Sequence, residues 1–155
     1  MSVRQILPVF GFLITACAVQ GKPPQTSDAK AIVQGYVRAW NQHDSAAFDT
    51  LLASDGTHDD FALDFHGKGP KQVTEFMRGM ISAEPDYNWR VTRIAQDGQT
   101  VALEWTWSAK YTGPDPNGKP VRDKATSGRG ASIVEVQDGK IKRFADYYDM
   151  ASFFK

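Results

Sequence analysis

The spacing of apolar residues changes once along this chain, near Pro85, and this change limits the fold class. Before Pro85, apolar side chains recur every three or four residues, as they do on one face of a helix. After Pro85 they alternate, as in a strand with one buried face. Helices followed by long strands predict an α+β fold, in which helices pack on one face of an antiparallel sheet.

Three helices are expected in the first half of the chain. The first covers residues 29–40, and the second is shorter, begins after Asp44 as its N-cap and ends at residues 54–56. Residues 58–65 follow as a short strand or an irregular connection. The third helix begins at Pro70, because proline is accepted in the first turn of a helix.

Two hairpins are expected in the second half. Asp97-Gly98 is a tight-turn pair that joins residues 88–95 to the next strand, and Asp138-Gly139 joins residues 124–136 to residues 140–148. A polar loop, residues 113–120, separates the hairpins. The clearest alternation is that of four apolar residues, Val101, Leu103, Trp105 and Trp107.

Residues 1–17 are typical of a signal peptide. The apolar run Ile6–Ala16 spans eleven residues, too few for a bilayer crossing, which needs about 20. The run ends in Ile14-Thr15-Ala16-Cys17, which resembles the bacterial lipobox, where cysteine is lipidated after cleavage. Cleavage after Ala18 is the alternative, because small residues also flank that position.

Lipidation of Cys17 would explain a single cysteine in an exported chain. Residues 18–27 then form a linker, and residues 28–155 form one domain. The expected location is outside the cytoplasm, as a periplasmic protein or a membrane-anchored lipoprotein of a bacterium. Contact with the membrane is expected only through the lipid anchor.

The composition limits the classes of partner that the protein is expected to bind. The 155 residues include 18 basic and 18 acidic side chains, a formal net charge of zero, which argues against a nucleic-acid partner. Aromatic residues make up 12% of the chain and include four tryptophans, which indicates a core or pocket rich in large rings. No nucleotide-binding glycine loop or nucleophile motif is present, and no cofactor is expected.

The last strand carries an acid between aromatic residues. Side chains alternate across a strand, so Phe144, Asp146 and Tyr148 share one face. An unpaired carboxylate is costly to bury. Asp146 therefore has either a structural partner or a role in proton transfer in a pocket.

Several short segments occur in an order and spacing that resemble the SnoaL-like family of the nuclear transport factor two-like superfamily. They are Tyr36–Asp44 with its Ala-Trp-Asn-Gln-His-Asp ending, His58-Asp59, Gly67–Gly69, Val101–Thr106, Asp138–Ile141 and Asp146–Asp149. The resemblance covers residues 29–149. It implies a cone-shaped roll in which a curved sheet and the N-terminal helices enclose an apolar pocket open at one end.

The resemblance leaves two functions open, because members of the family differ in what they do. Some close polyketide rings, shift double bonds or open epoxides with carboxylate, histidine and tyrosine groups. Others are binding or dimerisation modules. The chain is therefore expected to bind a small apolar or aromatic molecule, with acid/base catalysis of the isomerase, cyclase or hydratase type. The alternative is a non-catalytic ligand-binding or dimerisation module of the cell envelope, and a homodimer is a family-level expectation.

Two residues are candidates for catalysis. Asp146 occupies the late-strand position of the family's working aspartate. His58 follows the second helix, near the expected pocket mouth, where it either exchanges protons with a ligand or bonds to Asp59 or Asp60 as a loop histidine. Relatives often carry histidine where this chain has Phe144, and its absence predicts a drier cavity.

Arg129 lies between two glycines on the penultimate strand, where it either forms a charged pair with Asp146 in the cavity or a structural bridge. The cluster of acids and histidines from His58 to His66 matches no tight metal-binding signature, so no metal site is predicted. The expected pocket lining consists of Trp40, Phe61, Trp105, Trp107, Arg129, Phe144 and Tyr148.

Overall fold

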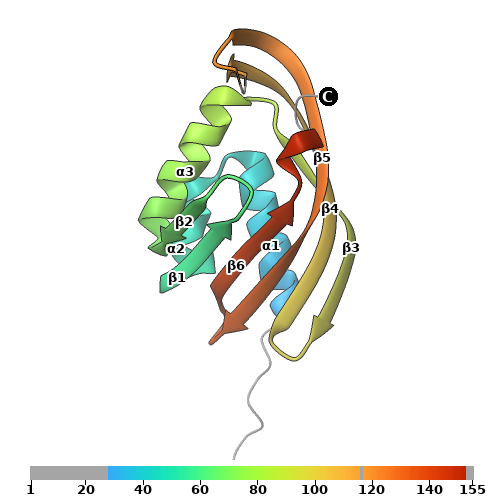
Figure 1. The fold of residues 1–155 in the computed structure, drawn as a ribbon. Coiled ribbons are helices and arrows are strands. Elements are labelled where there is room, and N and C mark those ends of the chain that lie inside the picture. The colour runs from blue at the N-terminus through green and yellow to red at the C-terminus, as the bar shows by residue number, and fades with distance from the viewer. Residues whose placement is uncertain (1–27, 116, 153–155) are drawn as a thin grey trace, which may run out of the picture.

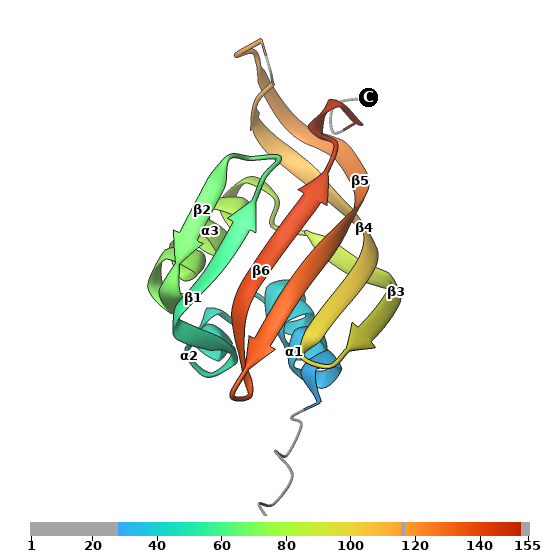
Figure 2. The ribbon, with the colours of Figure 1, turned by 60° about the horizontal axis from the view of Figure 1, so that its bottom comes forward.

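Six strands form one curved sheet against which three α-helices pack, in a computed structural model that describes residues 28–115 and 117–152. The elements are α1 (Ala29–Gln42), η1 (Ser45–Ala47), α2 (Phe48–Leu51), β1 (Leu52–Asp60), β2 (Phe65–Lys68), α3 (Gly69–Ala83), β3 (Asn88–Asp97), β4 (Thr100–Pro114), β5 (Pro120–Gln137), β6 (Lys140–Tyr148) and η2 (Met150–Ser152). The helices lie on one side of the sheet, which curves around them (Figures 1 and 2). The α+β cone predicted from the sequence is confirmed.

The sheet contains one parallel pair that the sequence did not predict. Its order is β2-β1-β6-β5-β4-β3, and every neighbouring pair is antiparallel except β1 with β6. The tight turns between consecutive strands enforce antiparallel pairing, but β1 and β6 are not consecutive in the chain. In the parallel register, His58 lies opposite Phe144 and Asp60 lies opposite Asp146.

The second helix is shorter than expected. Asp44 caps the turn as predicted, since its Oδ1 accepts the Ala47 backbone N–H at 3.3 Å. The α-helix, however, ends at Leu51, and residues 54–56 belong to β1. Pairing with β6 overrides the local helical pattern here, because the ladder hydrogen bonds and the burial of Leu52 stabilise the strand.

Helix α1 is tied to the sheet at its end. Asn41 bonds to the backbone of Trp89 on β3 twice, by accepting from the Trp89 N–H and donating to its carbonyl, both at 2.7 Å. The N-terminal end is capped by Asp28, whose Oδ1 accepts from the backbone N–H of Ala31 at 3.3 Å. The asparagine of the Ala-Trp-Asn segment is therefore a clamp between helix and sheet.

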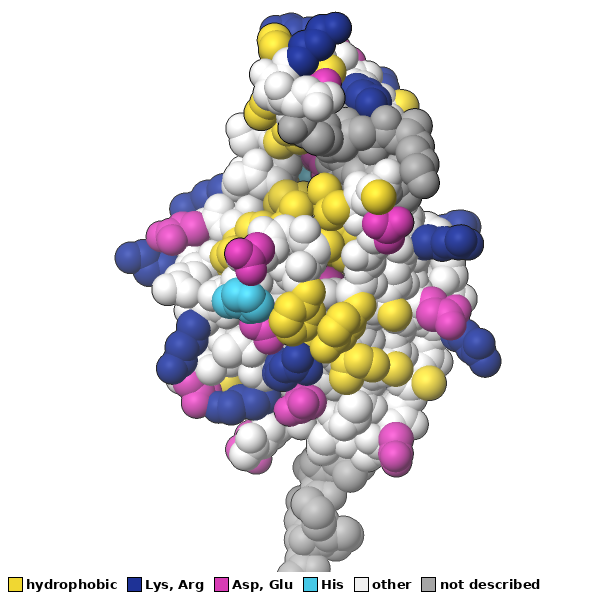
Figure 3. All heavy atoms as spheres, viewed as in Figure 1, with side chains coloured by type: hydrophobic (Ala, Val, Ile, Leu, Met, Phe, Trp, Pro, Cys, Tyr) yellow, Lys and Arg dark blue, Asp and Glu magenta, His cyan; other side chains and the backbone are white. Residues whose placement is uncertain are grey.

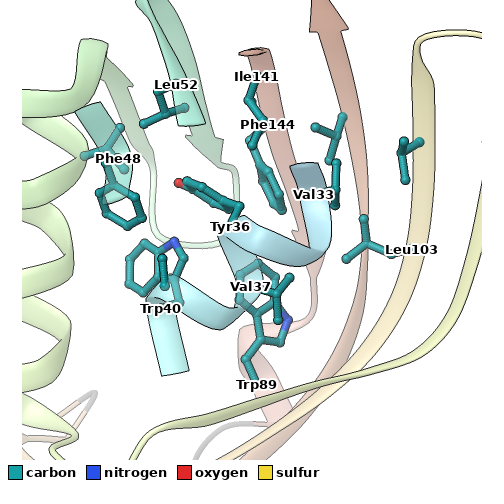
Figure 4. Close-up of a cluster of buried hydrophobic side chains, with 14 of the residues drawn as sticks. Val33, Tyr36, Val37, Trp40, Phe48, Leu52, Trp89, Leu103, Ile141 and Phe144 are labelled. Atoms are coloured by element: carbon teal, nitrogen blue, oxygen red, sulfur yellow. The ribbon is translucent and has the colours of Figure 1, made fainter. Parts of the chain in front are cut away.

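The core lies between α1 and the concave face of the sheet (Figure 4). Its buried side chains come from helices and strands far apart in sequence. Ten of them are labelled in Figure 4: Val33, Tyr36, Val37, Trp40, Phe48, Leu52, Trp89, Leu103, Ile141 and Phe144. Burial of so many large side chains supplies the main driving force for this fold.

The expected signal peptide, Cys17 and the linker to residue 27 lie outside the described residues. None of the helices within residues 28–115 and 117–152 has the length and apolar character that a bilayer crossing requires.

Candidate active site

A cavity of about 450 Å³ opens between the concave face of the sheet and the helices. Its aromatic lining comes from Trp40, Phe76, Tyr87, Trp89, Trp105, Trp107, Tyr111 and Tyr148. Its titratable lining comes from His58, Asp60, Glu84, Asp115 and Asp146. The volume lies within the range of ~300–1,000 Å³ that is usual for small-molecule sites, and mostly apolar walls with a few polar groups are typical of them.

Asp146 and His58 form a buried pair at this cavity. The Nε2 atom of His58 lies 2.9 Å from Oδ2 of Asp146, and the two residues are 2% and 6% exposed. Parallel pairing of β1 with β6 brings them together, because His58 and Asp146 both point to the concave face. His58 thus lies deep in the cavity and does not bond to Asp59 or Asp60 as a loop histidine.

Further hydrogen bonds hold both members of the pair. Oδ1 of Asp146 accepts a hydrogen bond from the hydroxyl of Ser132, which lies directly opposite on β5. The Ser132 oxygen in turn accepts the indole N–H of Trp105 at 2.7 Å. On the other side, Nδ1 of His58 lies 2.7 Å from the hydroxyl of Tyr36 on α1. The carboxylate is therefore fixed at both oxygens.

These contacts fit an arrangement of protons in which His58 is neutral. Burial raises the pKa of Tyr36, so its hydroxyl keeps its proton and can donate to Nδ1 of His58. A neutral imidazole then donates from Nε2 to Asp146, which accepts as a carboxylate. Both ring nitrogens of His58 are used, whereas the Asp146 oxygens retain free lone pairs. Asp146 is accordingly the member of the pair that can accept a proton from a ligand.

Asp60 adds a second carboxyl to the same face of β1, two residues after His58. Its Oδ2 accepts from the hydroxyl of Tyr148 at 2.9 Å, and its Oδ1 accepts from the backbone N–H groups of Ala62 and Leu63. Burial raises the pKa of Asp60, and the hydrogen bond from Tyr148 opposes that rise. Strand alternation could have indicated Asp60, but its strand was not recognised as regular.

Two tryptophans lie flat across the neighbouring strand because that strand carries glycine. Trp105 pairs with Gly130 and Trp107 pairs with Gly128. A Cβ atom at Gly130 would lie 2.6 Å from the Trp105 ring, and one at Gly128 would lie 2.6 Å from Nε1 of Trp107. The two glycines therefore make room for the indoles that form one wall of the cavity.

Glu84 is a titratable group that the sequence did not single out. It follows α3 directly, is 1% exposed and lines the cavity. Its Oε1 lies 3.3 Å from the hydroxyl of Thr126 on β5, and Oε2 has no hydrogen-bond partner within the described part of the chain. Burial raises the pKa of Glu84 to about 7, and the charge of Asp86 adds to the rise. No local motif marks a glutamate beside a proline as buried.

Three residues expected in the pocket lie elsewhere. Arg129 is exposed and not part of the lining, because it lies an odd number of residues from the inward-facing Ser132. Its expected pairing with Asp146 is wrong, since Ser132 occupies that register position. Phe61 is 46% exposed and stacks on Tyr147 outside the cavity. Phe144 is fully buried in the core beneath His58, with ring centroids 5.2 Å apart.

The other expected residues do line the cavity, namely Trp40, Trp105, Trp107 and Tyr148. The acid and histidine cluster of β1 and β2 splits between the two faces of the sheet. His58 and Asp60 face inward, whereas His66 bonds outside the cavity to Asp59 at 2.9 Å. Within the described residues, no three such side chains gather as a metal site would require.

Comparison with known proteins agrees with this fold. Residues 33–144, more than half of the chain, match the family model of the SnoaL-like domain. That segment includes His58 and stops two residues before Asp146. No curated protein sequence matches the chain.

Three solved structures illustrate the neighbours in fold. A candidate polyketide cyclase from Xanthomonas campestris is 26% identical, with a TM-score of 0.67 over 79% of this chain and 91% of that one. An LEH-like epoxide hydrolase from M. tuberculosis is 21% identical, with a TM-score of 0.67 over 84% of this chain and 90% of that one. A hypothetical protein with a ketosteroid isomerase-like fold from Catenulispora acidiphila, solved in complex with trimethylamine, is 23% identical, with a TM-score of 0.67 over 79% of this chain and 88% of that one. The last two likenesses show the fold alone.

Proposed function

The chain belongs to the SnoaL-like domain family, and from this premise we propose that it binds a small organic molecule and catalyses proton transfer on it. The reaction class is that of an isomerase, cyclase or hydratase. Asp146 is the acid/base group, and His58 positions it. The observation that carries this proposal is the buried Asp146–His58 pair in the wall of an aromatic cavity.

The chemistry follows from the contacts of Asp146. An ionised carboxylate in a cavity can take a proton from a carbon next to a carbonyl group and return it to another atom of the same molecule. Hydrogen bonds from Ser132 and His58 orient the carboxylate before the ligand arrives. The aromatic walls exclude water and hold an apolar ligand body.

The test compares binding with turnover. Enone and epoxide substrates are offered to the wild type and to Asp146→Asn, and binding is followed by tryptophan fluorescence. We expect Asp146→Asn to bind but to lose about 10²- to 10⁴-fold in turnover. Asp59→Asn, on the outer side of the same sheet, is the control that retains activity. An Asp146→Asn variant that turns over ligand at the wild-type rate would exclude the catalytic role.

A non-catalytic binding module is the second candidate, and one observation favours it. Both oxygens of Asp146 and both ring nitrogens of His58 already have protein partners. A pair with a protein partner at each of these atoms is also what a purely structural network requires. This function predicts ligand binding by the wild type with no turnover of any substrate in the panel.

Self-association is proposed for the outer face of the sheet. Hydrophobic side chains gather there in a patch visible in Figure 3. Its members are Phe61, Ile133 and Tyr147, which are 46%, 37% and 45% exposed. Exposed apolar patches of this kind commonly mark protein contacts, so a second copy of the chain is the proposed partner.

Export and lipid anchoring at Cys17 are proposed from the sequence. The supporting features are the short apolar run and the small residues before the cysteine. Metabolic labelling with a palmitate analogue in a bacterial host tests the anchor, with Cys17→Ala as control. Label in the wild type alone supports lipidation, whereas an unlabelled mature protein that begins at residue 19 supports cleavage after Ala18.

A further inference from the structure

The cavity has a second polar end, at Glu84, that the proton-transfer chemistry does not use. Glu84 is 1% exposed, and its Oε2 has no hydrogen-bond partner within the described residues. A buried polar atom left without a partner costs about 1–3 kcal/mol. A ligand group that bonds to Oε2 would remove this cost, so the unpaired atom points to a ligand contact.

Residue positions on strand β5 show how far apart the Asp146 end and the Glu84 end of the cavity lie. Ser132 bonds to Asp146 and Thr126 contacts Glu84, and these two residues lie on the same face of β5. Six residues of strand correspond to about 20 Å along the chain. Gly130 and Gly128 lie between them and carry the Trp105 and Trp107 rings. The indoles of Trp105 and Trp107 thus line an elongated part of the cavity, the lane, which has the carboxyl group of Asp146 at one end and that of Glu84 at the other.

The charges of the lane select the chemistry of the ligand. The cavity-lining residues include four carboxyl groups and no lysine or arginine. Tryptophan faces attract cations, whereas an anionic group would be repelled by the acids and would lack a basic partner. A ligand group at Glu84 is therefore cationic or a hydrogen-bond donor.

We propose that the cavity takes an elongated apolar molecule with a protonated amine at one end, which pairs with Glu84 while the body lies over Trp105 and Trp107. This inference rests on the proposed function for its reacting end, which lies at Asp146. The hydroxyl of Thr126 lies 3.3 Å from Oε1 of Glu84 and 3.2 Å from the carbonyl oxygen of Ala109. Oε2 of Glu84 therefore remains for the ammonium group of the ligand, which donates to the carboxylate.

Three probes of equal length test the selectivity: 4-phenylbutylamine, 4-phenylbutanol and 4-phenylbutanoate. Their dissociation constants are measured at pH 8 by calorimetry, so that no turnover is needed. We expect the amine to bind about tenfold or more tightly than the alcohol, and the carboxylate to bind most weakly. Equal binding of amine and alcohol, or a preference for the carboxylate, would overturn the proposal.

Substitutions at Glu84 test whether the amine of the ligand binds there. In Glu84→Gln we expect the preference for amine over alcohol to disappear, with alcohol binding unchanged. Glu84→Met serves as a second variant if the amide does not fold. Glu104→Gln, at a side chain that is 61% exposed, is the matched control and retains the preference. Survival of the preference in Glu84→Gln would overturn the proposal.

The Asp146→Asn variant distinguishes a failure of the Glu84 inference from a failure of the proposed catalytic function. Amine preference retained in Asp146→Asn supports the Glu84 site, whether or not the wild type turns over any substrate. Amine preference lost in Asp146→Asn but kept in Glu84→Gln places the amine at the other end of the lane and overturns the inference. Absence of turnover with amine preference intact removes only the catalytic proposal.

Discussion

The Nε2 atom of His58 lies 2.9 Å from Oδ2 of Asp146, although 88 residues separate them in the chain. Parallel pairing of β1 with β6 creates this contact, and Tyr36 and Ser132 hold its two ends. The pair is therefore a joint between the first and last strands as well as the proposed reactive centre. Its two roles can be separated experimentally.

A double-mutant cycle measures the coupling energy between His58 and Asp146. We expect His58→Gln to lower the free energy of unfolding by about 3 kcal/mol, because it leaves buried Asp146 without its partner. Combination with Asp146→Asn is expected to give a coupling energy of about 1–3 kcal/mol in chemical denaturation. The exposed pair His66 and Asp59 is the control, with an expected coupling below ~1 kcal/mol. A coupling energy no larger than that of the control pair would contradict the claim that the His58–Asp146 contact stabilises the connection between β1 and β6.

Alanine at Gly130 or Gly128 is expected to displace an indole. The new Cβ would lie 2.6 Å from the ring of Trp105 or from Nε1 of Trp107. We expect a loss of stability of about 1–3 kcal/mol and a changed near-ultraviolet circular dichroism spectrum. Gly79→Ala in α3 is the control, because nothing lies within 4 Å of its Cβ position. It is expected to be neutral or to stabilise by up to about 1 kcal/mol.

Glu84 is expected to make stability depend on pH. Burial raises its pKa from the ordinary 4.5 to about 7, so the folded protein binds this proton more tightly than the unfolded chain. The resulting stabilisation is complete below pH 4.5 and is lost as the pH rises through 7. Between pH 5 and 8, wild type should lose roughly 2–3 kcal/mol relative to Glu84→Gln. Thermal unfolding of both proteins is measured across this pH range. Stability that changes with pH equally in wild type and in Glu84→Gln would refute the raised pKa of Glu84.

Tyr148→Phe is expected to affect Asp60. The change removes the hydroxyl that donates to Oδ2 of Asp60 at 2.9 Å. Because this bond lowers the carboxyl pKa, its loss should raise the pKa of Asp60 further. Carbon NMR titration of the aspartate carboxyls gives the shift, and we expect a stability loss of about 1–3 kcal/mol. An unchanged Asp60 titration would show that the hydroxyl does not contribute.

Tyr147→Lys is expected to weaken self-association. The side chain is 45% exposed, stacks on Phe61 on the outer face and does not line the cavity. A charge in the centre of an apolar contact is costly to desolvate, so the variant should sediment as a monomer at concentrations where wild type dimerises. Ligand binding is expected to stay unchanged. A wild type that is monomeric at all concentrations would refute the proposed interface.

Local patterns in the sequence were sufficient for the fold class and most elements. Helical spacing with its caps predicted α1 and α3, and the Asp-Gly turns predicted the hairpins β3–β4 and β5–β6. These features depend on neighbours within a few residues, so the sequence alone determines them. The same reasoning grouped Trp105 with Trp107 and Asp146 with Tyr148 on shared strand faces, and all four residues line the cavity.

The tertiary structure decided what depends on contacts between distant segments. Alternation defines two faces of a strand but does not say which faces inward, so Arg129 was assigned to the wrong face. Parallel pairing of β1 with β6 ended the second helix early and brought His58 to Asp146. Burial of Glu84 arises only when α3, β4 and β5 meet. The chain therefore determines its own elements and turns, whereas the partners and charge states of its buried acids are determined by packing.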